Sequence, residues 1–283
     1  MSIQTVAVVG CGLMGAGIAQ VVAAAGYATI VCEQEEAPLA RGLARIRDGY
    51  ARSVKKGSMS DIAADAAFAR ITATLDRTAL RDADLVIEAI AEQAELKVAL
   101  FRELDAICKP TAIFASNTSS IPIHQIAQAT TRPDRVAGFH FFNPVPLMHL
   151  IELVSTPFTS PQTQALLREL GTTLGKTVVA VADQSGFIVN RLLIPYLFEA
   201  VRLLDAGVAD RDAIDTAMKL GCGYPMGPLM LLDVIGLDTA VSIGDVLARE
   251  LNDPRLAAPQ RLRDMVANGQ LGKKSGGGFY PLA

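Results

Sequence analysis

The sequence predicts an α/β fold in which a Rossmann-like, doubly wound and mostly parallel sheet is followed by a smaller all-helical domain. Short apolar runs alternate with longer amphipathic stretches as far as Asp183. This is the pattern of strand–helix–strand units in a sheet that helices cover on both faces. Beyond Asp183 helical patterns continue and strand signals almost disappear. We therefore expect two domains, residues 1–183 and residues 184–283.

The expected strands of the first domain are short apolar runs rich in β-branched residues. They lie at Thr5–Val9, Thr29–Cys32, Ile71–Thr74, Leu85–Glu88, Thr111–Ala115, Val136–Phe142, His149–Val154 and Thr177–Ala182. Helical periodicity fills most of the gaps between them, at Leu13–Ala25, Ala37–Lys56, Leu96–Ile107 and Gln162–Leu174. This alternation is the basis for the predicted sheet.

The second domain shows only helical patterns. They lie at Phe187–Ala206, Arg211–Leu220, Leu237–Leu251 and Leu256–Asn268. The segment Gly223-Tyr224-Pro225-Met226-Gly227-Pro228 interrupts the set, because two prolines and two glycines cannot continue a helix.

The composition favours a well-filled core and excludes some classes of partner. Of the 283 residues, 51% are hydrophobic and 19% are charged. The net charge of −3 argues against general binding to nucleic acid or to anionic membranes. The apolar stretch from Val6 to Cys32 lacks a basic start and holds several glycines, so it predicts a buried strand, loop and helix and not a membrane span.

The cysteines indicate a reducing compartment. None of them forms a C-x-x-C pair, and we expect all four to be small buried residues: Cys11, Cys32, Cys108 and Cys222. Together with the absence of a span, this predicts a soluble cytoplasmic protein.

A glycine motif separates the first expected strand from the first expected helix. Gly10, Gly12 and Gly15 form G-x-G-x-x-G, in which the glycines allow a tight turn, close approach of a pyrophosphate and close helix packing. Free N–H groups at the helix start, where Leu13 and Met14 lie, would meet the phosphate charge. Glu33 follows the second strand, 18 residues after Gly15, and a carboxylate there favours NAD over NADP. The alternative is a glycine-rich turn beside a surface glutamate.

Two titratable groups lie in stretches that otherwise indicate buried strands. His140 precedes Asn143-Pro144, which ends a strand at the sheet edge where ligands bind in such folds. Glu152 shares a strand face with Leu150 and Val154, where an unpaired carboxylate would be unfavourable. We predict that His140 and Glu152 pair, which would leave one imidazole nitrogen to act as a general base.

Simpler explanations of these two residues remain open at this point. His140 could be a hydrogen-bonded core residue, and Glu152 could pair with Arg135 or Arg191. Of the other histidines, His124 is expected at the surface and His149 at the start of a strand.

Two further polar groups could complete a site. The segment Ser116–Ser120 places hydroxyl and amide groups after a strand, and Asn190 lies in the first turns of an apolar helix. Helix capping by the hydroxyls and a buried hydrogen bond of Asn190 are equally good explanations.

The chain resembles the 3-hydroxyacyl-CoA dehydrogenase family, in particular its short bacterial 3-hydroxybutyryl-CoA dehydrogenases. The resemblance covers nearly the whole chain and rests on segments in the family's order: GCGLMGAGIAQ, VIEAIAE, FASNTSSIPI, GFHFFNPVPLMHLIELV, DQSGFIVNRLLIPYLFEA, GYPMGPL and GKKSGGGFY. It implies reversible, NAD-dependent oxidation of an (S)-3-hydroxyacyl-CoA to the 3-oxoacyl-CoA, without a metal.

The resemblance also implies residue roles. His140 is the catalytic base, Glu152 its partner, and Ser119 and Asn190 hold the reacting end of the substrate. Four residues fall on the cofactor side: Glu92, Lys97, Asn117 and Asn143. Glu33 stands where the family commonly has an aspartate, and it keeps the charge.

A basic stripe is predicted on the helix at Ala37–Lys56. Its members recur at helical spacing: Arg41, Arg45, Arg52 and Lys56. The stripe either binds the phosphates of CoA or forms a solvated helix face. The family's CoA-contacting helix favours Ser53 and Lys56 as substrate contacts.

The sequence leaves two other functions open, and it also predicts how the chain assembles. The fold could serve a free hydroxy acid or sugar acid, as in gulonate-dehydrogenase-like relatives, or a silent NAD-binding protein of the crystallin-like kind. The apolar faces of the helical domain predict a homodimer through residues 184–283. Among acyl groups, the resemblance favours short chains, including 3-hydroxybutyryl.

Overall fold

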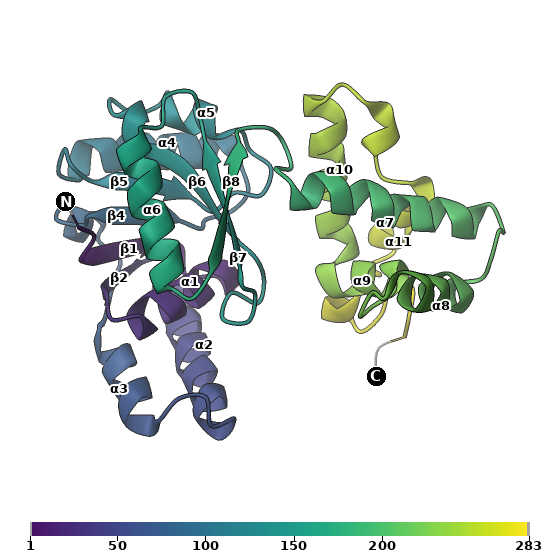
Figure 1. Cartoon of the computed structure of the whole chain (residues 1–283), viewed down its shortest axis with the longest axis horizontal. Coiled ribbons are helices and arrows are strands. Elements are labelled where there is room, and N and C mark those ends of the chain that lie inside the picture. Colours follow the sequence, from purple (N-terminus) through teal and green to yellow (C-terminus); the bar gives the residue numbers. More distant parts are fainter. Residues whose placement is uncertain (1, 282–283) are drawn as a thin grey trace. The chain divides into compact units, whose positions relative to one another are not determined.

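The computed structural model describes residues 2–281 and divides the chain into two compact units, Met1–Asp183 and Gln184–Ala283. The first unit is an α/β sheet domain and the second is helical (Figure 1). No helix within residues 2–281 is long and apolar enough to cross a membrane.

A single eight-stranded sheet forms the first unit, in the order β3-β2-β1-β4-β5-β6-β7-β8. The six strands from β1 to β6 are mutually parallel, whereas β7 runs antiparallel to β6 and β8 is parallel to β7. The mostly parallel sheet is therefore confirmed. The strands span β1 (Thr5–Val9), β2 (Ala28–Cys32), β3 (Ile71–Thr74), β4 (Leu85–Glu88), β5 (Ile113–Ser116), β6 (Val136–Phe141), β7 (Leu150–Ser155) and β8 (Thr177–Ala182).

Helices cover the sheet on both faces. Helix α6 lies in front of the strands, and α4 and α5 lie behind them (Figure 1). Two helices of this unit were not predicted, α3, which Ser60 caps, and the short α5. A third unpredicted helix, Pro228–Ile235, lies in the second unit. The helices of this unit are α1 (Leu13–Ala24), α2 (Glu36–Lys55), α3 (Asp61–Ala69), α4 (Ala94–Ile107), α5 (Ile123–Ala127) and α6 (Pro161–Thr173).

The core of the first unit lies between the central strands and their helices. Every residue of β4, β5 and β6 is buried, because each strand has neighbours on both sides and helices on both faces. The expectation of cover on both faces is wrong for β8. This edge strand has no buried residue: four of its six residues are exposed, Val179 among them, and two are half-buried.

The second unit is built from five helices around its own apolar core. They are α7 (Val189–Asp205), α8 (Arg211–Cys222), α9 (Pro228–Ile235), α10 (Leu237–Glu250) and α11 (Gln260–Ala267). The predicted interruption lies between α8 and α9, and Pro228 begins the new helix, where its missing N–H is harmless. The expectation that all cysteines are buried is wrong for Cys222, which ends α8 and is exposed.

Candidate active site

The predicted site residues of the first unit gather where its parallel strands end. The strand order reverses between β1 and β4, and in open sheets of this kind ligands bind at the point of reversal. The turn after β1 packs directly on the turn after β4, since a Cβ on Gly10 would lie 2.6 Å from the carbonyl oxygen of Ala89.

The surroundings of the chain require glycine at two of the three positions of the motif. Gly10 has a φ of +93°, which favours glycine. A Cβ on Gly15 would overlap the carbonyl oxygen of Gly10, so Gly15 is needed for the close packing of α1. Gly12 is different, because its φ is −68° and a Cβ there would meet no atom within 4 Å. No contact within the chain explains Gly12.

Open space at Gly12 fits a dinucleotide. Gly12 precedes the free N–H groups at the start of α1, where Leu13 is 62% exposed despite its apolar side chain. Beside the loop, the Glu33 carboxylate accepts hydrogen bonds from the backbone N–H groups of Cys11 at 2.8 Å and Gln34 at 2.9 Å. These residues fit a bound NAD, with phosphates at the helix start and a ribose near Glu33.

His140 and Glu152 are a direct cross-strand pair. They occupy opposite positions in the antiparallel ladder of β6 and β7, and His140 Nδ1 lies 2.8 Å from Glu152 Oε2. The side chains of His140 and Glu152 are only 7% and 1% exposed. The imidazole ring also packs on Phe142, whose ring centroid lies 4.5 Å away. The predicted contact between the two residues is present.

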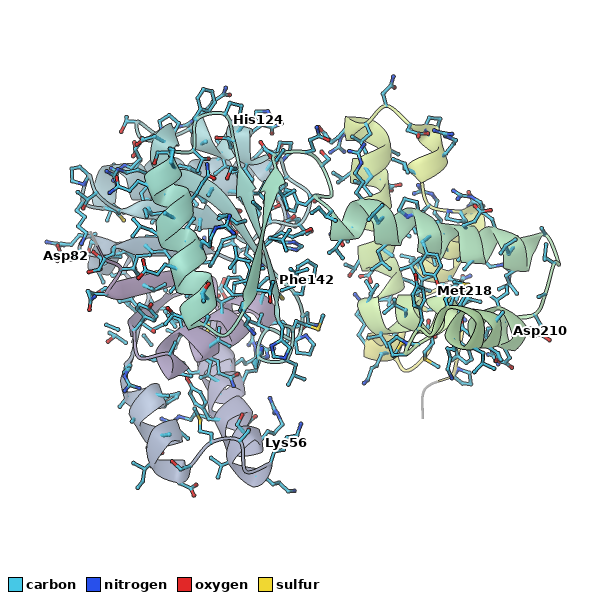
Figure 2. All side chains as sticks on the ribbon, viewed as in Figure 1. Lys56, Asp82, His124, Phe142, Asp210 and Met218 are labelled. Carbon is cyan, nitrogen blue, oxygen red and sulfur yellow. The ribbon has the colours of Figure 1, made fainter. Side chains whose placement is uncertain are left out.

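The burial and the hydrogen bond of His140 also fit a core residue, whereas the two arginines considered as partners of Glu152 make contacts elsewhere. Arg135 donates to the carbonyl of Thr111, and Arg191 contacts Gln184. His124 lies far from Lys56 in Figure 2, and its half-exposed ring pairs with Asp183 at 2.7 Å. His124 is therefore near the surface, as expected, although Asp183 holds it.

Glu92, Lys97 and Ser119 form one connected cluster. Lys97 lies 3.2 Å from Glu92, whose carboxylate accepts hydrogen bonds from Thr118 Oγ1 at 2.6 Å and from the N–H of Ser119 at 2.9 Å. Burial opposes ionisation of Glu92, but the Lys97 charge and these hydrogen bonds outweigh it and lower the pKa of Glu92.

A member of this cluster that we did not predict is Glu88, at the end of β4. Its fully buried carboxylate pairs with Lys97. The signal was available in the sequence, because Glu88 ends an apolar strand just as Glu152 interrupts one.

Asn117 and Asn143 lie just after the ends of β5 and β6. Asn117 Oδ1 accepts a hydrogen bond from the N–H of Phe141 at 2.8 Å, which ties the end of β5 to the residue after His140. Asn143 follows β6 and is exposed.

A cavity of about 470 Å³ lies between α1, α2 and the segment after β6. Three of the four stripe residues line it, together with both predicted CoA contacts and two predicted cofactor residues: Arg45, Arg52, Ser53, Lys56, Leu13 and Asn143. Arg41 and Lys55 lie outside the lining. The segment that forms the opposite wall is fastened by Lys176, whose buried ammonium donates to the carbonyls of Val145 and Met148, each at 2.7 Å.

The helical unit holds the last predicted residue and a second cavity. Asn190 lies in the first turn of α7, as expected, and its relation to His140 stays a prediction. The cavity also measures about 470 Å³ and is lined by Arg211 and Arg261. Asp212 and Asp205 pair with these arginines. We therefore assign this second cavity no role in the reaction.

Comparisons with known proteins agree on one family. The model of the 3-hydroxyacyl-CoA dehydrogenase NAD binding domain matches residues 5–184, and that of the C-terminal domain of the same enzymes matches residues 186–282. A 3-hydroxybutyryl-CoA dehydrogenase of Mycobacterium tuberculosis is 47% identical over 281 residues, which cover 99% of this chain and 98% of the relative.

Two further relatives extend the likeness to other organisms and to a solved structure. The human mitochondrial hydroxyacyl-coenzyme A dehydrogenase is 46% identical, over 98% of this chain and 91% of that protein. The crystal structure of (S)-3-hydroxybutyryl-CoA dehydrogenase from Ralstonia eutropha superimposes with a TM-score of 0.95 at 42% identity, over the full length of both chains.

Proposed function

Because the chain belongs to the 3-hydroxyacyl-CoA dehydrogenase family, we propose that it oxidises a short-chain (S)-3-hydroxyacyl-CoA, such as 3-hydroxybutyryl-CoA, reversibly to the 3-oxoacyl-CoA. It is an NAD-dependent dehydrogenase of that family. The observation that carries the proposed chemistry is the buried contact between His140 and Glu152.

His140 is the proposed general base. Glu152 accepts a hydrogen bond from Nδ1–H of the imidazole, which directs proton exchange with the 3-hydroxyl group to Nε2. NAD bound at the glycine loop supplies the acceptor for the C3 hydride. The positive imidazolium that His140 becomes is stabilised by the Glu152 carboxylate, and burial of both groups strengthens that attraction.

The remaining assigned residues hold the two substrates. We assign Ser119 and Asn190 to the reacting end of the acyl group. Ser53 and Lys56 are assigned to CoA, because both line a cavity that also exposes Arg45 and Arg52 to an anionic ligand. Gly10–Gly15, Glu33, Glu92, Lys97, Asn117 and Asn143 are assigned to the cofactor.

The proposed assembly is a cytoplasmic homodimer. Several large apolar side chains of the helical unit are exposed in the single chain, among them Leu192, Val208 and Leu220. A second copy would cover such residues. Light scattering on the purified protein checks the dimer, and a monomer at micromolar concentration would contradict it.

Substrate comparison tests the proposed function. NADH oxidation is measured with acetoacetyl-CoA and with free acetoacetate at equal concentrations. We expect turnover with the thioester and at least ~10² lower kcat/KM with the free acid, because the acid forgoes all contacts to CoA. Faster turnover of acetoacetate would indicate a hydroxy-acid dehydrogenase. Tight NADH binding without any turnover would indicate a silent NAD-binding protein.

A further inference from the structure

A lysine and a glutamate form an ion pair inside the first unit, away from the surface. The side chain of Lys97 on α4 is 1% exposed, and that of Glu88 at the end of β4 is 0% exposed. Removing two charges from water is unfavourable, and apolar residues of similar size often give equal or better stability. A reason other than stability is therefore needed for this pair.

Glu88 is held from three directions. Its Oε1 accepts hydrogen bonds from Lys97 Nζ and from the N–H of Ile90, the latter at 2.7 Å. Its Oε2 accepts a hydrogen bond from Ser116 Oγ at 2.6 Å. The carboxylate thereby joins β4, the turn that follows it, β5 and α4, and these contacts leave it a single orientation.

Lys97 also pairs with a second carboxylate, that of Glu92, which is more exposed than Glu88. The ammonium of Lys97 lies 3.2 Å from Glu92, whose side chain is 39% exposed. Glu92 Oε1 in turn accepts from Thr118 Oγ1, from the N–H of Ser119 and from Ser120 Oγ, the last at 3.1 Å. One continuous series of contacts thus runs from the core residue Glu88 to the segment that contains Ser119.

We propose that Glu88 is a positioning residue for the dehydrogenase reaction. It fixes the ammonium of Lys97, which holds Glu92 in the orientation that receives the Ser119 segment. Glu88 therefore determines the geometry at the reacting end of both substrates although it touches neither. The proposal rests on the function proposed above, in which Ser119 contacts the acyl group and Glu92 and Lys97 lie on the cofactor side.

A purely structural strut would behave differently from a positioning residue. Loss of a strut lowers the free energy of unfolding and leaves the molecules that remain folded fully active. Loss of a positioning residue changes kcat and cofactor affinity in folded molecules. Since the CoA contacts lie on α2, KM for the acyl-CoA changes little in that case.

The test is a double-mutant cycle of Glu88→Gln and Lys97→Met. In Glu88→Gln we expect kcat for acetoacetyl-CoA reduction to fall at least ~10-fold and the Kd of NADH to rise at least ~3-fold, with KM for acetoacetyl-CoA within ~3-fold of wild type. In the Lys97→Met background, Glu88→Gln should lower kcat by less than ~2-fold, because its effect passes through Lys97. Effects that multiply, or normal kcat in folded Glu88→Gln, would overturn the proposal.

Asp84→Asn is the matched control. Asp84 lies at the other end of β4, pairs with Lys109 at 2.6 Å and accepts from the N–H groups of Gln4 and Thr5. It makes a similar set of contacts away from the site. We expect the melting temperature to fall and kcat to stay within ~2-fold of wild type.

A milder variant keeps the proposal testable if Glu88→Gln does not fold. Ser116→Ala removes one donor to Glu88 without changing any charge, and we expect a fall in kcat of about 3-fold with unchanged KM for acetoacetyl-CoA. Unchanged kcat would count against Glu88. A wild-type protein that binds NADH but does not reduce acetoacetyl-CoA would instead contradict the proposed function, and the NADH affinities of the variants would then decide on Glu88.

Discussion

Both units bury carboxylates, but they use them in different ways. In the sheet unit, Glu152 faces His140 and Glu88 faces Lys97, so each carboxylate meets a side chain that can carry positive charge. In the helical unit, Asp233 accepts hydrogen bonds from the backbone N–H groups of Phe279 at 2.9 Å and Tyr280 at 2.8 Å. Asp215 accepts from the first turn of α9 and from the Tyr280 hydroxyl.

The difference in partners distinguishes carboxylates that can take part in a reaction from carboxylates that hold a chain segment in place. A carboxylate bound by backbone N–H groups holds a chain segment in place, and the glycine-rich segment GKKSGGGFY packs on Asp233 for this reason. A Cβ on Gly278 would overlap the Asp233 carboxylate, and one on Gly272 would overlap the Asp233 main chain. A carboxylate opposite a titratable side chain can instead stabilise a charge that appears during turnover. The type of partner, more than burial, indicates a reactive site.

The largest expected effect is that of His140→Gln. We expect kcat to fall by about 10²–10⁴ because no base remains, while NADH affinity and melting temperature change little. Steady-state kinetics measure kcat, and NADH fluorescence titration measures the NADH affinity. Near-normal turnover would remove His140 from the mechanism.

Asp233→Ala should lower the stability of the protein and leave its catalysis unchanged, the reverse of His140→Gln. Loss of the carboxylate leaves the N–H groups of Phe279 and Tyr280 without their acceptor, so we expect the free energy of unfolding to fall by about 2–4 kcal/mol. The kcat of folded molecules should not change. Urea denaturation measures the loss, and Asp210→Ala, which removes one cap from α8, is a smaller control of about 1 kcal/mol. A catalytic defect without a stability defect would contradict the comparison.

Charge reversal on α2 tests whether the cavity beside this helix binds the phosphates of CoA. Arg52→Glu combined with Lys56→Glu should raise KM for acetoacetyl-CoA about 10-fold, with kcat unchanged, because CoA phosphates would meet negative charge. The control reverses Arg41 and Lys55, which lie on the same helix but outside the cavity lining. Equal effects of both pairs would indicate long-range electrostatics, and an unchanged KM in the first pair would exclude the CoA contact.

The smallest expected effect is a difference in pH dependence. Lys97 and hydrogen bonds overcome burial and lower the pKa of Glu92, so its stabilisation is present above the unfolded pKa and is lost as pH falls through the folded one. Burial raises the pKa of Asp233, so its destabilisation above the folded pKa is relieved on acidification.

Two variants should therefore shift the acid response in opposite directions. Between about pH 7 and about pH 4, where carboxyl groups begin to titrate, Glu92→Gln should reduce the loss of stability and Asp233→Asn should increase it. Urea midpoints at the two pH values measure the shifts. Shifts of the same sign would contradict this assignment.

Local pattern predicted the strands and the contact between His140 and Glu152 because both depend on neighbours in sequence. His140 was found from its place before Asn143-Pro144, and Glu152 from the alternation of its strand. The antiparallel direction of β7 was not predicted, although the connection from β6, residues 142–149, is too short for a parallel crossover.

Other features depend on contacts between distant segments. Helix α3 was missed because its alanine-rich sequence has little apolar periodicity. Asp215 and Asp233 lie in helices, where a carboxylate usually indicates a solvated face, and only the folded C-terminal segment gives them their partners. Glu88 could have been found by the argument used for Glu152, but Lys97 as its partner could not, because Lys97 looked like part of a solvated helix start.

The cross-strand position of His140 and Glu152 has a consequence for protein engineering. Backbone pairing of β6 with β7 sets the distance between the two side chains, and the length of the connection does not. Residues 144–149 can therefore be lengthened or grafted to redesign substrate preference while the proposed proton-transfer pair, Phe142 and Asn143 are kept. Such grafts should retain two carbonyls at the positions of Val145 and Met148, where Lys176 anchors the segment.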